Sequence, residues 1–486
     1  MSSITRTAGL EEFSAFIAER TGLYFPREKY PDLELAVSRA APELGFTDAA
    51  ACINRLLTSR PDKELLETLA AYLTIGETYF FRNKADFDAI TNIVLPALTG
   101  DRHHEESLRI WSAGCATGEE PYSIAMLLDN CSPALKSRAV SILATDINSS
   151  ALRAAGRGVY GDWSFREVPQ HIKDTYFTKT RDKKLALLAR IREMVDFSYL
   201  NLAEDSYPAL VTATNAMDLI LCRNVLMYFR ADLAEAVLRK FRAALKDGGW
   251  LILGPAEGPL TFSGKIPGLE PAQLPGLTIY RKAAVPRPHH LSLHAAAAAP
   301  AIPSKAAAAR TRPPAPPAPK KRPLEAAAAL YRTGRYTEAG KELEALLTVE
   351  PQNSAGLILL ARVRANLGRL AEAGKLCTKA IEANKLDPLA HYLLGNIFLE
   401  EGRESEAGMS FRKALYLAPD HILAHLALGN LFLRGGKAAW ARRHFKNAAA
   451  LLKRHGQQDV LPDSEGMTAG RLGEIARSAL TRCADD

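Results

Sequence analysis

The chain has 486 residues, of which 47% are hydrophobic and 24% charged, and its formal net charge is +8. This length exceeds what one hydrophobic core usually organises, so it predicts two or three domains. No apolar run approaches the roughly 20 residues that a membrane helix needs, and the scattered cysteines form no CxxC pair. We therefore expect a globular cytoplasmic protein without membrane insertion, disulfides or a metal site.

Residues 1–85 show helical periodicity, as in LEEFSAFIAERTGL and DKELLETLAAYL, and no strand pattern. They predict an N-terminal helical domain followed by an interdomain segment. In residues 86–282, strand patterns (SLRIWSA, AVSILATDI, MDLILCR, GWLILG, LTIYRK) alternate with helical ones (SIAMLLDN, SSALRAAG, DLAEAVLRKFRAALK). Such alternation predicts an α/β domain with a mostly parallel sheet flanked by helices.

The stretch WSAGCATGEEPYS, residues 111–123, lies between the first strand pattern and a helix. Gly114 and Gly118 allow the backbone to pass close to a ligand at the carboxyl ends of the strands. The spacing is not GxGxxG, and Glu119 and Glu120 would repel a pyrophosphate. Carboxylates suit a cofactor that carries an ammonium and a sulfonium group instead.

Two further strands end in polar residues. Asp146 in ATDIN can accept hydrogen bonds from both hydroxyls of a ribose. Together with the glycine loop, this favours an S-adenosylmethionine (AdoMet) site, whereas Asp146 alone could equally be a helix N-cap ahead of Ser149. In LILCRNVLMYF, the polar residues Arg223, Asn224 and Tyr228 follow a buried strand; the alternative is an ordinary turn with a half-buried tyrosine.

Residues 283–322 are rich in Ala and Pro and contain Lys and Arg but neither Asp nor Glu. They predict an extended basic linker. Because this segment can account for the positive charge, and because no basic, aromatic-rich face or NPPY-like motif is found, no nucleic-acid partner is expected.

Beyond the linker the sequence repeats with a period of 34 residues, which is seen at Gly334, Gly368, Gly402 and Gly436. This period is that of a helix-turn-helix solenoid. Residues 323–455 resemble tetratricopeptide (TPR) repeats, and residues 456–486 predict a capping helix and tail. Since TPR grooves bind peptides or helices, a peptide or protein ligand of the array is one expectation.

The segments ETYFFR, WSAGCATGEEPYSIAM, ATDIN, VDFSYLNL, ILCRNVLMYF and LKDGGWLILG resemble the successive motifs of the chemoreceptor glutamate methyltransferases, the CheR family. The added TPR array is similar to the branch that serves Wsp-type surface-sensing pathways. The resemblance implies a small N-terminal all-α domain, a class I (Rossmann-like) methyltransferase domain and, near 160–195, a small β-subdomain. It also implies AdoMet as cofactor, S-adenosylhomocysteine as product, and glutamates on the cytoplasmic helical bundle of a methyl-accepting chemoreceptor as substrate.

The same resemblance assigns roles to individual residues. Arg82 and Tyr228 are the expected catalytic pair beside the transferred methyl group, although Arg82 alone could be a surface arginine. Gly76 stands where the family often has Asn. The expected cofactor-binding residues are Gly76, Thr78, Arg82, Gly114, Glu120, Asp146, Asn201, Leu202, Arg223 and Asn224.

Two features predict weak capture of the receptor. The helix LELAVSRAAPELGF offers only Arg39 against Glu34 and Glu43, and the small β-subdomain lacks the glycine-containing insertion of relatives that bind a receptor's C-terminal peptide. The rival interpretation is a TPR adaptor that senses AdoMet without transferring a methyl group. The presence of Arg82, Glu120, Asp146, Arg223 and Tyr228 favours the enzyme.

Overall fold

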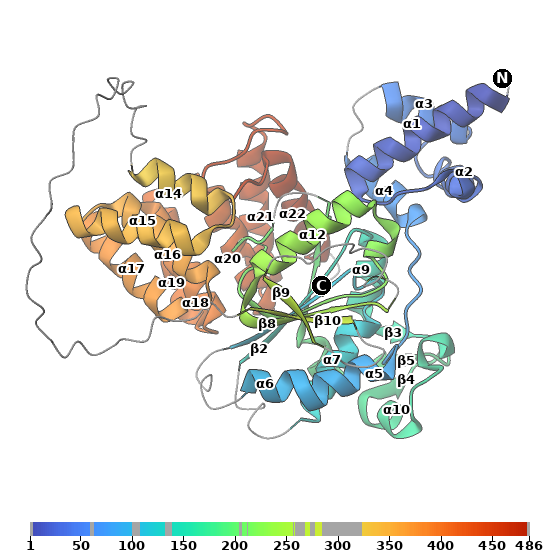
Figure 1. Ribbon diagram of the computed structural model, residues 1–486, viewed down its shortest axis with the longest axis horizontal. Coiled ribbons are helices and arrows are strands. Elements are labelled where there is room, and N and C mark those ends of the chain that lie inside the picture. Colours follow the sequence, from blue (N-terminus) through green and yellow to red (C-terminus); the bar gives the residue numbers. More distant parts are fainter. Residues whose placement is uncertain are drawn as a thin grey trace, which may run out of the picture.

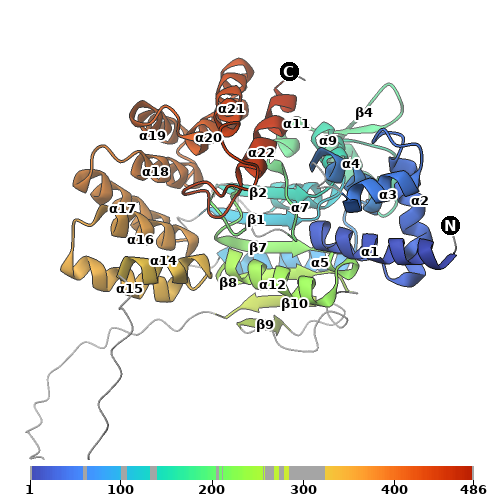
Figure 2. The same ribbon diagram turned by 90° about the horizontal axis from the view of Figure 1, so that it is seen from above.

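The computed structural model describes residues 3–58, 63–99, 107–131, 139–203, 207–210, 212–255, 257, 268–272, 278–283 and 323–483. Apart from Ala283, the linker predicted at 283–322 lies outside the described residues. The central sheet lies between the N-terminal helices, drawn in blue, and the C-terminal helical array, drawn in orange to red (Figures 1 and 2). Within the described residues, no helix is both long enough and apolar enough to cross a membrane.

The central sheet has the strand order β6-β2-β1-β7-β8-β10-β9. The pairs among its first five strands are parallel, and β10 is antiparallel to both neighbours, which confirms the predicted mostly parallel α/β fold. The order reverses at β1, where ligands of open α/β sheets bind. The strands are β1 (Leu108–Ala113), β2 (Val140–Asp146), β6 (Val195–Tyr199), β7 (Met217–Cys222), β8 (Leu245–Leu253), β9 (Leu269–Ala272) and β10 (Thr278–Lys282).

The sequence patterns missed some element boundaries. Neither β6 nor β9 was among the predicted strands, and the helix predicted through Lys246 ends at Ala244 because Leu245 pairs with Met217 of β7. The helices that cover the sheet are α5 (Lys84–Ala89), the π-helical turn η2 (Ile90–Val94), α6 (Leu95–Thr99), α7 (Glu119–Asp129), α9 (Ser149–Arg157), α11 (Ala189–Arg192) and α12 (Ala231–Ala244).

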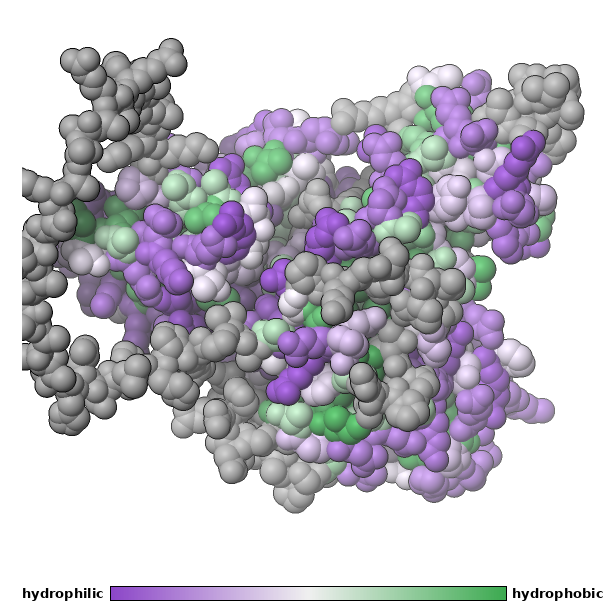
Figure 3. All heavy atoms as spheres, viewed as in Figure 1, coloured by the Kyte–Doolittle hydropathy of each residue, from purple (hydrophilic) through white to green (hydrophobic). Residues whose placement is uncertain are grey.

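A second, three-stranded sheet lies in the region where the small β-subdomain was expected, with the order β3-β5-β4. Its residues are mainly hydrophilic on the face seen in Figure 3, as is usual for a solvent-facing subdomain. Its elements are β3 (Val159–Tyr160), η3 (Asp162–Phe165), α10 (Gln170–Tyr176), β4 (Phe177–Lys179) and β5 (Leu185–Leu187).

The N-terminal helices enclose their own apolar core, which includes Phe13, Ile17 and Leu33. After them the chain runs extended to α5 along the central domain (Figure 1). Phe80 anchors this interdomain segment because its ring is fully buried. Its ring centroid lies 5.1 Å from that of Phe165 and 5.2 Å from that of Phe177. The helices are α1 (Ser3–Thr21), α2 (Tyr30–Ala40), α3 (Ala49–Thr58) and α4 (Lys63–Leu73).

The C-terminal array consists of paired helices, as the 34-residue period predicted. The periodic glycines have positive φ, for example +76° at Gly368, so they supply the left-handed turn within each pair. A Cβ at Gly395 would lie 2.5 Å from the Phe411 ring, so a small residue is required where the helices cross. The helices are α14 (Pro323–Arg332), α15 (Tyr336–Val349), α16 (Ser354–Asn366), α17 (Leu370–Ala383), α18 (Pro388–Glu400), α19 (Glu404–Leu417), α20 (Ile422–Arg434), α21 (Ala438–Leu452) and α22 (Ala469–Arg482).

Candidate active site

A cavity of about 720 Å³ lies at the carboxyl ends of β1, β2 and β7. This size is in the range of small-molecule and cofactor sites. The interdomain segment and the N-terminal helices close it from the other side. Every site residue predicted from the sequence lines this cavity, namely Gly76, Thr78, Arg82, Gly114, Glu120, Asp146, Asn201, Leu202, Arg223, Asn224 and Tyr228.

The loop from β1 to α7 brings backbone to the cavity. Gly114 has φ of +83°, and a Cβ there would lie 2.3 Å from Cγ2 of Val225, so only glycine fits without displacement. The Gly114 amide donates to the carbonyl of Thr145 at 2.7 Å, which fixes the loop on β2. The backbone conformation and the packing of Val225 thus require glycine at this position, which lines the cavity.

Asp146 ends β2, and burial raises the pKa of its carboxyl group while backbone N–H groups oppose this shift. Its Oδ2 accepts from the Ala116 amide and its Oδ1 from the Asn148 amide, both at 2.8 Å. Asn148, not Asp146, is the N-cap of α9, since its side chain accepts from the Ala151 amide. The N-cap alternative for Asp146 is therefore wrong, and the carboxylate faces the cavity.

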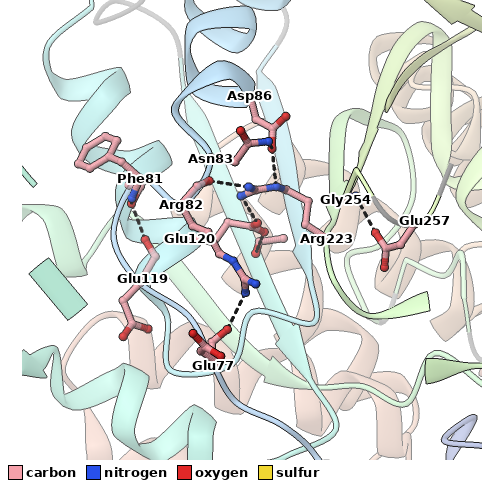
Figure 4. A network of polar contacts seen from close by, with 12 residues as sticks. Glu77, Phe81, Arg82, Asn83, Asp86, Glu119, Glu120, Arg223, Gly254 and Glu257 are labelled. Carbon is pink, nitrogen blue, oxygen red and sulfur yellow. Dashed lines mark hydrogen bonds and ion pairs between the residues drawn. The ribbon is translucent and has the colours of Figure 1, made fainter. Parts of the chain in front are cut away.

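Arg223 is the centre of a buried polar network, shown in Figure 4. Its side chain is 3% exposed; Nε lies 2.8 Å from Oδ2 of Asp86 and Nη1 3.0 Å from Oε2 of Glu120. Nη2 donates to the carbonyl of Arg82. The other Glu120 oxygen accepts from the Ser112 hydroxyl at 2.7 Å. The network thus joins α5, α7, β7 and the interdomain segment.

Asp86 was not predicted as a site residue. Burial raises the pKa of its carboxyl group, and the ion pair with Arg223 opposes this shift. Little in the sequence indicates that Asp86 belongs to the site, because an aspartate four residues after Arg82 could equally lie on the exposed face of a helix. Only the fold shows that Asp86 is 1% exposed and paired with Arg223.

Glu119 does not face the cavity, unlike the adjacent Glu120. It is buried away from the cavity, where Thr117 donates to its Oε2 at 2.6 Å and Ser164 to its Oε1 at 2.9 Å. The two residues diverge because successive positions of a helix point about 100° apart. The expectation that both Glu119 and Glu120 face a cofactor is wrong for Glu119.

The turn after β7 depends on Glu257, a second residue that the sequence analysis missed. Its fully buried carboxylate accepts from the amides of Val225 at 2.6 Å, Leu226 at 2.7 Å and Gly254 at 2.6 Å. Asn224, with φ of +58°, stands at the start of this turn. Glu257 thereby fixes the backbone that presents Asn224 and Tyr228 to the cavity.

The chain after β6 forms another wall of the cavity with Leu200, Asn201 and Leu202. Asn201 is 3% exposed, and its side-chain amide donates to the carbonyl of Arg20 in α1 at 2.7 Å. Its Oδ1 accepts from the Ala203 amide at 3.0 Å. The Asn201 side chain thus shapes the loop and joins it to the N-terminal helices, while Leu202 adds apolar surface.

Arg82 and Tyr228 complete the cavity from the side of the N-terminal helices. Arg82 Nη1 donates to the carbonyl of Glu77 at 2.7 Å, which uses one of the five N–H groups of a guanidinium. The carbonyl of Tyr228 accepts from the Tyr24 amide at 2.8 Å, and its ring packs against the N-terminal core. Lys29 and Arg39 also line the cavity.

Comparison with known proteins identifies the family. Residues 76–263 match the CheR methyltransferase SAM-binding domain, and residues 330–397 and 389–421 match tetratricopeptide repeats. The chain is 34% identical to a chemotaxis protein methyltransferase of Borreliella burgdorferi over 49% of this chain and 83% of the relative. The chain belongs to the CheR methyltransferase family. A second relative, chemotaxis protein methyltransferase 1 of Pseudomonas aeruginosa, is 32% identical over 51% of this chain and 90% of its own length.

Membership of the CheR family confirms the predicted combination of a methyltransferase domain with TPR repeats. It also confirms the enzyme class, protein-glutamate O-methyltransferase, and AdoMet as the cofactor. The residues present fit this cofactor chemically. Asp146 offers a carboxylate for hydroxyl groups, Leu200 and Leu202 offer apolar surface, and the network of Glu120 and Asp86 with Arg223 offers two carboxylates for one guanidinium.

Proposed function

We propose that this CheR-family chain, acting in the cytoplasm, methylates glutamate γ-carboxylates on the helical bundle of a methyl-accepting chemoreceptor. One observation carries the proposal: a single cavity joins the predicted cofactor residues at the sheet edge to Lys29, Arg39 and Arg82 on the opposite side. Carboxylates and apolar groups on one side suit AdoMet. On the other side Arg39 and Arg82 suit an anionic substrate. The charge of Lys29, in contrast, is opposed by Asp32, which lies 3.2 Å away and also lines the cavity.

The residues assigned to AdoMet have distinct tasks. Asp146 binds the ribose hydroxyls, Asn201 and Leu202 flank the adenine, and Glu120 holds the amino end. Thr78, Gly76, Arg223 and Asn224 complete the wall around the methionyl part, and Gly114 lets the backbone approach. The bound sulfonium supplies an electrophilic methyl group.

The substrate side requires positioning rather than proton transfer. A glutamate has a reference pKa of about 4.3, so it is already ionised at neutral pH and needs no general base. Arg82 and Tyr228 orient the carboxylate for in-line displacement, and alignment of this kind can contribute several kcal/mol. Each methyl ester removes one negative charge from the receptor bundle, which reduces repulsion between its helices.

The reaction can be tested with labelled AdoMet and purified receptor cytoplasmic fragments. We expect base-labile label on glutamate, loss of this label with Asp146→Asn, and no label on fragments whose acceptor glutamates are changed to Gln. Binding of AdoMet without transfer to any receptor fragment would instead support an AdoMet-sensing adaptor. Label on RNA or a small molecule would contradict the proposed substrate.

A further inference from the structure

The chain that flanks the proposed adenine site leaves the central sheet at β6. This strand pairs with β2 and, within the described residues, lies at one edge of the sheet. The next residues, Leu200, Asn201 and Leu202, line the cavity. An edge strand receives support from one strand only, so the position of this wall depends on what holds it from outside the sheet.

The first outside support is Arg471, on the last helix of the C-terminal array. Its Nη2 donates to the carbonyl of Tyr199 at 3.0 Å, and its guanidinium carbon lies 4.6 Å from the centroid of the Tyr199 ring. Arg471 is 5% exposed and is paired with Glu474 one turn later at 3.1 Å. Tyr199 directly precedes the cavity wall, so Arg471 holds the chain where it enters the wall.

The second outside support is Glu465, in the segment between the last two helices of the array. Its Oε2 accepts from the Leu210 amide at 2.6 Å, and its Oε1 from the Tyr331 hydroxyl at 2.6 Å. The Leu210 side chain is buried in the apolar cluster of the array, which includes Leu357 and Ile358. The chain is therefore held again at Leu210, eight residues after Leu202.

The two supports are connected to the wall itself by short contacts. The Leu200 amide donates to the carbonyl of Asp146 at 3.1 Å, and the Tyr207 hydroxyl donates to the carbonyl of Leu202 at 2.9 Å. A displacement at Tyr199 or Leu210 thus reaches Asn201 and Leu202 through few bonds.

The array that carries both residues is itself fixed on the central domain. Arg109 of β1 and Glu400 of α18 form an ion pair at 3.5 Å, and their side chains are only 6% and 7% exposed. Within the array, Arg362 donates to the side chain of Asp463 at 3.1 Å and to its carbonyl at 2.8 Å, which holds the segment that presents Glu465. Figure 2 shows the array beside the edge of the sheet.

We propose that the C-terminal array is part of the cofactor site, and that Glu465 and Arg471 are positioning residues that hold the adenine-flanking wall at both ends. This inference rests on the proposed function, because that function assigns Asn201 and Leu202 to the adenine. The docking of the array then sets the affinity of the catalytic domain for the adenosyl group.

The test uses the full chain and calorimetric binding of S-adenosylhomocysteine, which needs no receptor. We expect Arg471→Ala and Glu465→Asn each to raise its Kd by about threefold to tenfold, the effect of losing one or two hydrogen bonds. Asn is chosen because Glu465 has φ of +55°, which Asn tolerates. The KM for AdoMet should rise in parallel, with kcat at saturation within about twofold. Arg471→Lys should restore part of the affinity.

The matched control is Arg434→Ala. Arg434 pairs with Asp196 across the same interface, but both side chains are about half exposed, and neither lines the cavity. We expect Arg434→Ala to bind S-adenosylhomocysteine with the same Kd as the unchanged chain. An unchanged Kd in both Arg471→Ala and Glu465→Asn, or an equal rise in Arg434→Ala, would overturn the inference. If the unchanged chain binds no S-adenosylhomocysteine, the proposed function and this inference both fail. If the unchanged chain binds it but methylates no receptor fragment, only the proposed function is contradicted.

Discussion

Arg223 is held by Asp86, Glu120 and the carbonyl of Arg82, and its side chain is 3% exposed. A buried arginine of this kind is stable because its charge is paired with carboxylates and its two Nη groups donate to polar partners. Two carboxylates around one guanidinium also leave an excess of negative charge beside the cavity while Asp86 and Glu120 are ionised. This network explains how Glu120, at the start of α7, and Arg223, after β7, form one site.

Tyr228 gives the sharpest test of the proposed catalytic pair. We expect Tyr228→Phe to lower kcat by about tenfold to a hundredfold, since one hydrogen bond that aligns the substrate is lost. The affinity for AdoMet should change less than twofold, because the ring, which packs against the N-terminal core, is retained. Steady-state kinetics together with calorimetry separate the two effects; equal turnover would remove Tyr228 from the mechanism.

Two histidines on neighbouring helices of the array, the buried His425 on α20 and the half-buried His444 on α21, lie within hydrogen-bond distance of each other. His425 Nε2 lies 3.0 Å from the carbonyl of Pro419, so it carries the proton, and His425 Nδ1 accepts from His444 Nδ1 at 3.0 Å. Burial, with His425 and Arg443 nearby, lowers the pKa of His444 to about 4. The folded array therefore favours neutral His444.

This lowered pKa predicts that the array loses stability in mild acid. The stabilisation is present above the unfolded pKa of about 6.5 and is lost as the pH falls towards 4, because the unfolded chain binds the proton first. His444→Asn keeps a donor near the position of Nδ1 but cannot titrate. Between pH 7 and pH 4.5, the midpoint of urea unfolding should therefore fall less for this variant than for the unchanged chain. Parallel curves for both proteins would show that His444 does not contribute.

The array and the central domain are joined by the ion pair between Arg109 and Glu400. Burial raises the pKa of Glu400, while Arg109 opposes the shift. Ser107 adds a hydrogen bond to the carbonyl of Glu400 at 3.3 Å, and Asn215 donates to its side chain at 3.5 Å. Most of these partners are far apart in sequence, so they form only when the two parts dock.

Removing one member of this pair should be costlier than removing both. Glu400→Ala leaves the Arg109 guanidinium buried without its ionic partner, which we expect to cost about 3–5 kcal/mol. The double variant Arg109→Met with Glu400→Leu should recover most of this loss, since apolar side chains of similar size fill the space. Urea unfolding of both variants measures the difference. A double variant as unstable as Glu400→Ala would contradict the explanation.

Features that leave a local pattern along the chain could be predicted from the sequence. Gly114 was recognised because a tight backbone approach requires glycine, and Asp146 because it ends an apolar strand. The 34-residue period of the array was visible because each repeat needs the same left-handed turn at positions such as Gly368.

Which of these groups come into contact could not be predicted from such patterns. The direction of Glu119, the burial of Asp86 and the anchoring of the Glu257 turn depend on contacts between distant segments, which impose no period on the chain. The docking of the array is the largest example. Arg109 reads as an ordinary residue of a strand and Glu400 as an ordinary helix end. They become partners only where the array packs on the central domain and excludes water from both side chains.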